Sequence, residues 1–176
     1  MKKSVWLGGL LGGVAMYVVV SISWMALPFH NNALLKFKDE AAVTSAIAAN
    51  VAGPGMYMLP KGHGEAEMKQ WQTGPTMFAA VRTGGNTSMF PHLAIQLVGT
   101  LVAGVLIAWM LSRTSGLKFW DKVGFVTAVG AVAGILVLIP EWNWFGFSIA
   151  HIGVQFLDLI VGWFAGGWVM AKIMKK

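Results

Sequence analysis

Four long runs of apolar residues are the strongest pattern in this chain, and one long polar stretch separates the first run from the second. The runs cover residues 5–27, 90–111, 123–139 and 149–173. A helix needs about 20 residues to cross the hydrocarbon core of a bilayer. Each run is therefore predicted to be a transmembrane helix, and the third is the shortest.

The polar stretch, residues 28–89, carries signals of structure of its own. Asp39 and Glu40 precede an alanine-rich helical pattern over 41–50, and Gly53-Pro54-Gly55 ends it. Residues 56–59 and 77–81 are predicted to be short strands, with a short helix over 65–72 between them. Because an isolated hairpin is marginal in water, we expect a small helix-plus-hairpin cap on the outer ends of the apolar helices.

The remaining connections, 112–122 and 140–148, are short enough to join only antiparallel neighbours. The predicted fold class is an all-α membrane protein: an up-down bundle of four transmembrane helices with a small extracytoplasmic helix-plus-β-hairpin cap. The first helix (1–27) and the last three (90–176) form one bundle domain, and the cap (28–89) is inserted between them.

Composition and charge place this bundle in a membrane and orient it. Only 11% of the residues are charged and 56% are hydrophobic, whereas soluble domains contain about 25% charged residues. The net charge of +6 does not indicate nucleic-acid binding, because the basic residues flank the apolar runs instead of forming a stripe. Lys2, Lys3, Arg113, Lys118, Lys122, Lys172, Lys175 and Lys176 cluster on one side. This positive-inside bias predicts a multi-pass membrane protein with both termini cytoplasmic. The first run is too long for a cleaved signal peptide.

Small residues recur at intervals of four along the helices, a spacing that lets transmembrane helices approach closely. The predicted packing positions are Gly9, Gly13, Gly130, Gly134, Gly162 and Gly166. In the second helix the same periodicity places His92, Gln96, Gly99 and Ala103 on one face.

Polar side chains gather on the outer half of every predicted helix or just beyond it. All four histidines lie on this side, and Asp158 lies near the middle of the last apolar run. Lipid cannot solvate such groups, so they are expected to face one another and to mark function. The candidate polar pocket consists of His30, His92, Gln96, Glu141, His151, Gln155 and Asp158.

Each candidate has a functional and a structural interpretation. Asp158 either binds a proton or cation, or hydrogen-bonds a neighbouring helix to fix its register. His92 and His151 either ligate a metal or haem between facing helices, or act as interfacial hydrogen-bonding groups. The methionines and histidines together are compatible with copper. There is no cysteine, so thiol chemistry is excluded; we expect no cofactor, with haem or copper as the alternatives.

No phosphate-binding glycine loop, zinc-protease motif or nucleophile elbow is present. We therefore expect a non-enzymatic accessory or scaffold subunit that meets the lipid bilayer and a membrane-protein partner or a second copy, and no nucleic acid. The first alternative is a small transporter or proton- or ion-handling protein that uses Asp158 and the outer-side histidines. The further alternatives are a metal- or haem-binding redox subunit and a membrane enzyme that acts on lipid.

Several short motifs also carry a resemblance. They are Trp24-Met25-Ala26-Leu27-Pro28-Phe29-His30, Gly55-Met56-Tyr57 with Pro60, Gly74-Pro75, and Trp142-Asn143-Trp144. Together they resemble an uncharacterised group of bacterial inner-membrane proteins with four predicted helices. The resemblance covers most of the chain and implies topology and localisation, but no activity.

Overall fold

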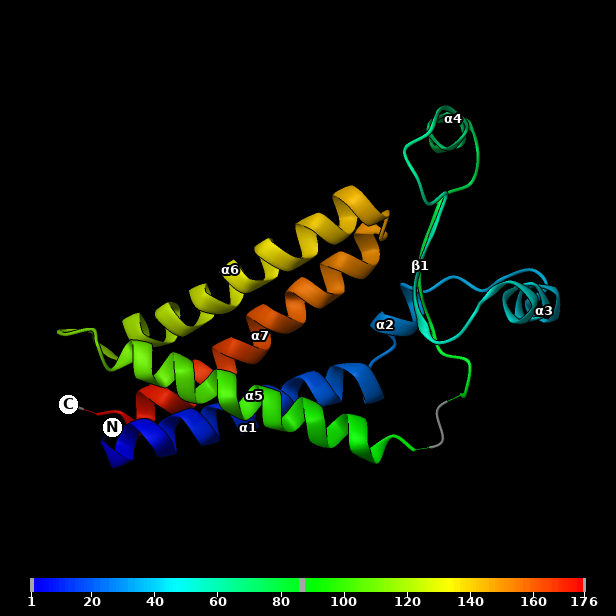
Figure 1. Ribbon diagram of the computed structural model, residues 1–176. Helices are drawn as coiled ribbons and strands as arrows, with labels where there is room; N and C mark the ends of the chain where they lie inside the picture. Colours follow the sequence, from blue (N-terminus) through cyan, green and yellow to red (C-terminus); the bar gives the residue numbers. More distant parts are fainter. Residues whose placement is uncertain (1, 86–87, 176) are drawn as a thin grey trace.

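The computed structural model describes residues 2–85 and 88–175, and its fold is mostly helical (Figure 1). Four of its helices are long and apolar enough to cross a membrane: α1 (Lys3–Ala26), α5 (Phe90–Leu111), α6 (Phe119–Phe145) and α7 (Ile149–Ile173). The prediction of four long apolar helices is confirmed.

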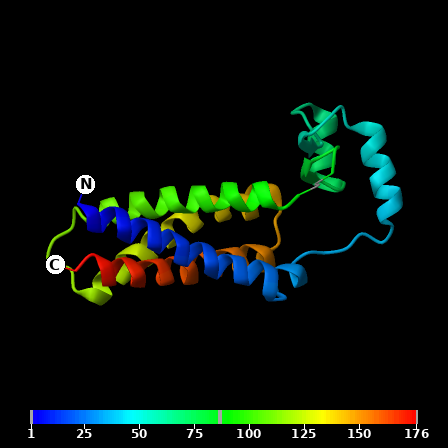
Figure 2. The ribbon, with the colours of Figure 1, turned by 90° about the horizontal axis from the view of Figure 1, so that it is seen from below.

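Successive long helices run in opposite directions, so the described ends of the chain lie together at one end of the bundle (Figure 1 and Figure 2). We call this the termini end. The opposite end, where α1 leads into the polar insertion, is called the cap end. The short connections between the long helices bring about this alternation, as they predicted.

The helices form two close pairs, α1 with α5 and α6 with α7, and α1 also packs along α7. Helices α5 and α6 make few contacts and diverge toward the cap end (Figure 1). The main core cluster lies mostly toward the termini end, where it includes Val5, Leu111, Val126 and Met170. The bundle is therefore closed at the termini end and spread apart at the cap end.

Glycine allows the backbones of α1 and α5 to touch. A Cβ atom added to Gly9 would lie 2.6 Å from the Cα of Val105, and one on Gly13 would lie 2.9 Å from the carbonyl oxygen of Thr100. A Cβ on Gly104 would meet the carbonyl oxygen of Gly9. These contacts are between main chains, so no side-chain movement can relieve them.

The glycines of α6 and α7 serve similar contacts. Gly130 and Gly134 lie under the aromatic rings of Trp163 and Phe156, with an added Cβ at 2.6 and 2.8 Å from ring carbons. Gly162 lies against Met16, at 3.1 Å, and Gly166 lies against the carbonyl oxygen of Gly12, at 2.9 Å. Gly99, in contrast, faces open space, so the expected packing face of α5 is displaced from His92 and Gln96 toward Thr100 and Gly104.

Helix α6 is longer than its apolar run indicated, because it continues through Pro140 to Phe145 and is followed by Gly146, which has a φ of 74°. Proline lacks the N–H that would bond the carbonyl of Leu136, but its fixed φ fits a helix. One missing bond near a helix end is tolerated. At its start the helix gains a turn because the Asp121 carboxylate accepts a 3.0 Å hydrogen bond from the backbone of Lys118.

The insertion contains α2 (Phe29–Asn32), α3 (Glu40–Asn50), β1 (Gly55–Leu59), α4 (Glu65–Thr73) and β2 (Met77–Val81). Strands β1 and β2 pair antiparallel, with Tyr57 opposite Ala79. The strands and both longer helices lie where the sequence predicted them, whereas α2 was not predicted.

The cap stands beside the cap end of the bundle, with α3 and α4 projecting away from it (Figure 1 and Figure 2). Phe78 of β2 stacks on Phe145 at the end of α6, with ring centroids 4.2 Å apart. None of the residues of α3 is buried. The expectation that the cap lies across the helix ends is therefore wrong for α3, whose apolar residues contact too little of the bundle to hold it there.

Candidate functional site

A cavity of about 930 Å³ lies at the cap end, between all four long helices. It forms where α5 and α6 diverge (Figure 1). The other half of the bundle, toward the termini end, is closed by the glycine contacts. Most of its wall is apolar, and its hydrogen-bonding side chains in the long helices include Tyr17, His92, Gln96, Thr100, Gln155 and Asp158. Arg82, just after β2, also lines it. We call it the cap-end cavity.

A buried histidine–carboxylate contact forms part of this site. His30 Nε2 lies 2.9 Å from Asp158 Oδ2, and the histidine is only 2% exposed. The two residues are 128 positions apart in the chain. The contact therefore ties the start of the cap to the middle of α7.

The local sequence explains how His30 reaches this position. Helix α1 ends at Ala26, and Leu27 is extended. Pro28 precedes the short helix α2, which returns His30 toward the end of α1. There the imidazole stacks on Trp24 with ring centroids 3.7 Å apart, and its Nε2 lies 3.3 Å from the Ser23 hydroxyl. The reversal at Pro28 thus builds a closed niche for one imidazole ring.

Only one ring nitrogen of His30 is paired among the described residues. Its Nε2 lies within hydrogen-bonding distance of both Asp158 and the Ser23 hydroxyl, whereas its Nδ1 is buried and has no hydrogen-bond partner among them. The ring is therefore held from one side, through Asp158 in the wall of the cavity.

The two histidine–glutamine pairs of the sequence occupy different positions. His92 and Gln96 both line the cap-end cavity from α5. On α7 only Gln155 lines the cavity, and its amide Nε2 lies 2.7 Å from Nε2 of His151. Since an amide nitrogen donates, His151 accepts this bond and orients Gln155.

Glu141 lies apart from the other candidates. It follows Pro140 within α6, and it is not among the described residues that line the cavity. Its carbonyl accepts from the backbones of Gly146 and Phe147. The expected pocket thus divides: His92, Gln96, Gln155 and Asp158 line one cavity, His30 is linked to it through Asp158, His151 is linked through Gln155, and Glu141 belongs to a helix end.

Several residues at the site were not part of the candidate pocket. Ser23 falls on the same helical stripe as Met16 and His30 in the sequence, and the structure buries it. Tyr17 donates a 3.3 Å hydrogen bond to the Leu93 carbonyl of α5. Arg82 reaches the cavity only because of the tertiary arrangement of the cap, which no local pattern reveals.

The residues present do not form a metal site of the usual kind. Within residues 2–85 and 88–175, no three histidine or carboxylate side chains lie close enough together to hold a metal ion. The proposed ligands His92 and His151 also differ in position, since His92 lines the cavity and His151 bonds Gln155. The geometry adds no support to the haem or copper interpretation.

Comparison with family models, with curated proteins and with solved structures finds no match to this chain.

Proposed function

We propose that this chain is a multi-pass protein of the bacterial inner membrane that acts by binding and not by catalysis. In this role it is an accessory or scaffold subunit, and its cap-end cavity receives an amphipathic group from a membrane-embedded ligand or partner. Support for the setting comes from the four helices that are long and apolar enough to cross a membrane.

The distribution of charge supports a cytoplasmic termini end. Lys2, Arg113, Lys118, Lys122 and Lys175 belong to the helix ends and the connection on this side. Cytoplasmic loops of membrane proteins carry an excess of lysine and arginine. In this orientation the cap and the mouth of the cap-end cavity lie outside the cytoplasm.

The observation that carries the proposal is the depth of the polar groups in the cavity. Asp158 is nine residues along α7 from Ile149, and a rise of about 1.5 Å per residue places it about 14 Å from the start of that helix. This is near the middle of a hydrocarbon core about 30 Å thick. Polar groups at that depth are stabilised by hydrogen-bonding partners, and an apolar wall with few polar positions is typical of a ligand site.

The cap supports a role with a partner. Leu35 is 95% exposed and Phe37 is 63% exposed, although both are apolar. The hairpin stacks on the bundle through Phe78, and a two-stranded hairpin is marginal in water by itself. A membrane-protein partner or a second copy that covers this surface would stabilise the cap.

A bulky residue in the cavity tests the proposal. Ala133 lines the cap-end cavity, whereas its neighbour Val132 is exposed on α6 and does not line it. Ala133→Trp is expected to displace the bound group, and Val132→Trp is expected to retain it. Native mass spectrometry of protein released from native-lipid nanodiscs measures the mass of the complex. Displacement of the bound group appears as the loss of the mass of a bound ligand or of a partner subunit. Bare monomer in both the unmodified chain and the Val132→Trp control would contradict the proposal.

One observation favours proton or ion handling as a second candidate function. The His30–Asp158 contact brings together two buried ionisable groups, and Asp158 also lines the cap-end cavity. Asp158→Asn keeps the size of the side chain and its ability to accept from His30, but it cannot exchange a proton. Proton flux into proteoliposomes, followed with an enclosed pH-sensitive dye, should then fall to the level of empty vesicles. Equal flux with Asp158→Asn and with the unmodified chain removes this candidate.

A further inference from the structure

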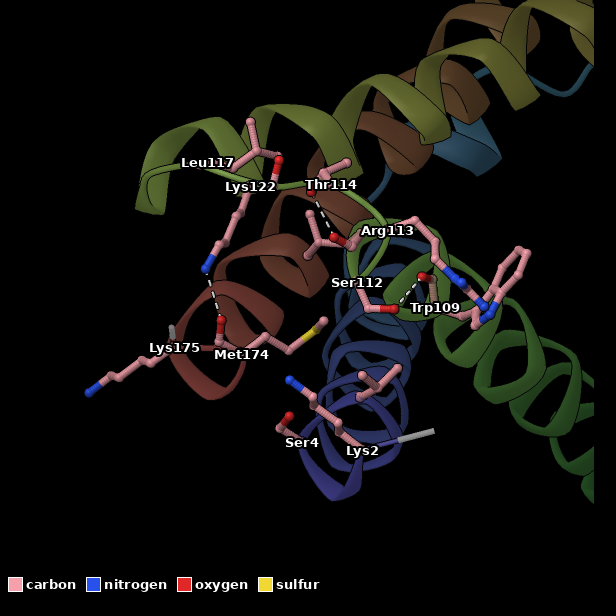
Figure 3. A pocket seen from close by; sticks show the side chains of 14 residues that line it. Lys2, Ser4, Trp109, Ser112, Arg113, Thr114, Leu117, Lys122, Met174 and Lys175 are labelled. Atoms are coloured by element: carbon pink, nitrogen blue, oxygen red, sulfur yellow. Dashed lines mark hydrogen bonds between the residues drawn. The ribbon is translucent and has the colours of Figure 1, made fainter.

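We propose that a second cavity, at the termini end, is a binding site for a phosphate-bearing anion. This inference rests on the proposed membrane setting but not on any role of the cap-end cavity. The cavity measures about 590 Å³ and lies where the start of α1, the α5–α6 connection, the start of α6 and the end of α7 meet (Figure 3). We call it the termini-end cavity.

Positive charge is the main chemical property of its described lining. Lys2, Arg113, Lys122 and Lys175 all line it, and none of its described lining residues is acidic. The nearest acid in sequence, Asp121, already accepts a hydrogen bond from the backbone of Lys118. Like charges that line one cavity repel one another, so an anion that enters it gains attraction from those that reach it.

The basic side chains are held in different ways. Lys122 donates a 2.8 Å hydrogen bond to the Met174 carbonyl at the end of α7, which fixes its ammonium at the cavity wall. Figure 3 shows Lys2 pointing toward Met174 and Lys175 pointing away from the other labelled residues. Lys2, just before α1, and Lys122, in α6, line the cavity from separate parts of the chain.

Arg113 relates the cavity to the bilayer surface. Its guanidinium lies 5.2 Å from the centroid of the Trp109 ring, one turn earlier. Tryptophan is enriched at the level of the lipid headgroups, and arginine binds phosphate with two parallel hydrogen bonds. In the proposed orientation, the cavity thus lies where headgroup phosphates of the cytoplasmic leaflet and soluble phosphate compounds both have access.

Serine and threonine hydroxyl groups also line the termini-end cavity. Ser112 and Thr114 donate to the carbonyls of Trp109 and Leu111, at 2.6 and 2.7 Å, and these bonds fix the turn after α5. Ser4 and Ser115 also line the cavity, and their hydroxyls supply neutral donors beside the cations. Val5 and Leu111, which also line the cavity, are buried core residues, so part of its wall is apolar.

The test compares a phosphate-bearing lipid with a soluble phosphate compound. Protein in mild detergent is titrated with phosphatidylglycerol, with phosphatidylcholine of the same chains, and separately with inorganic pyrophosphate; bound lipid is counted by native mass spectrometry and pyrophosphate binding is measured by calorimetry. The variant is Lys2→Gln with Arg113→Gln. The control is Lys36→Gln with Lys38→Gln, which removes the same charge from the exposed cap.

At least one of the two anions should bind more tightly than phosphatidylcholine. The double variant at the cavity should raise the Kd of that anion by about 30-fold, as expected for loss of two basic groups near a membrane surface. The control pair should change the Kd by less than about 3-fold. Binding of phosphatidylglycerol alone identifies a lipid headgroup as the ligand, and binding of pyrophosphate with the same dependence identifies a soluble phosphate compound. Equal weakening by both pairs, or no selective binding of either anion, overturns the proposal.

Discussion

Gly104→Leu is expected to separate α1 from α5 and to lower the free energy of unfolding by about 3 kcal/mol or more. Overpacking a core costs about 1–3 kcal/mol where side chains can adjust. Here an added Cβ meets the Gly9 carbonyl oxygen and lies 3.0 Å from the Gly13 Cα, so the main chains themselves must move apart. Unfolding in increasing dodecyl sulfate, followed by far-UV and near-UV circular dichroism, measures the change.

Gly99→Leu is the matched control, because it makes the same chemical change on the same helix at a position that faces open space. This variant should keep the unfolding midpoint of the unmodified chain within error or raise it slightly, since leucine is the better helix former. Equal loss of stability in the two variants would show that α1 and α5 do not meet through their glycines.

Asp158→Leu is expected to cost about 3 kcal/mol, because it leaves buried His30 without its carboxylate partner. Removing one member of a buried ionic or hydrogen-bonded pair typically costs about 3–5 kcal/mol. The Nε2 of His30 would retain only the Ser23 hydroxyl, at 3.3 Å, and its Nδ1 already has no partner among residues 2–85 and 88–175. Because this contact also ties α2 to α7, hydrogen exchange over residues 28–34 should accelerate.

Asp158→Asn is the control, since its amide oxygen still accepts from His30 and the expected cost is only about 1 kcal/mol. The double variant His30→Leu with Asp158→Leu should lose less stability than the two single variants combined, because neither member of the pair is left buried without the other. Additive losses would show that the two side chains are not in contact.

The sequence predicted the helices well because their signals are local. The runs of apolar residues gave the first and last residues of α5 and α7 as the structure has them. The turn residues around Gly53 and Gly74 separated the elements of the cap. Proline misled the prediction for α6, since its missing N–H costs one bond and not the whole helix. The four-residue helix α2 has no periodicity to detect, yet it places His30.

The site was predicted in its chemistry and less well in its contacts. The polarity of Asp158, Gln96 and Gln155 in apolar runs indicated a shared pocket, and the structure brings them to one cavity. The partner of Asp158 depends on the reversal of the chain at Pro28, which periodicity does not describe. Periodicity also did not predict which glycine of α5 meets another backbone: Gly104 meets Gly9 of α1, whereas Gly99 faces open space.

A cysteine accessibility experiment tests most directly whether a polar cavity opens at membrane depth from the cap end. The chain contains no cysteine, so single substitutions report without background. Gln96 lines the cavity, whereas Val98, two residues along the same helix, does not line it and is 59% exposed on the bundle surface. A membrane-impermeant thiol reagent added outside intact spheroplasts is expected to modify Gln96→Cys and to leave Val98→Cys unmodified. Equal protection of both cysteines, or equal reaction of both, would contradict the account.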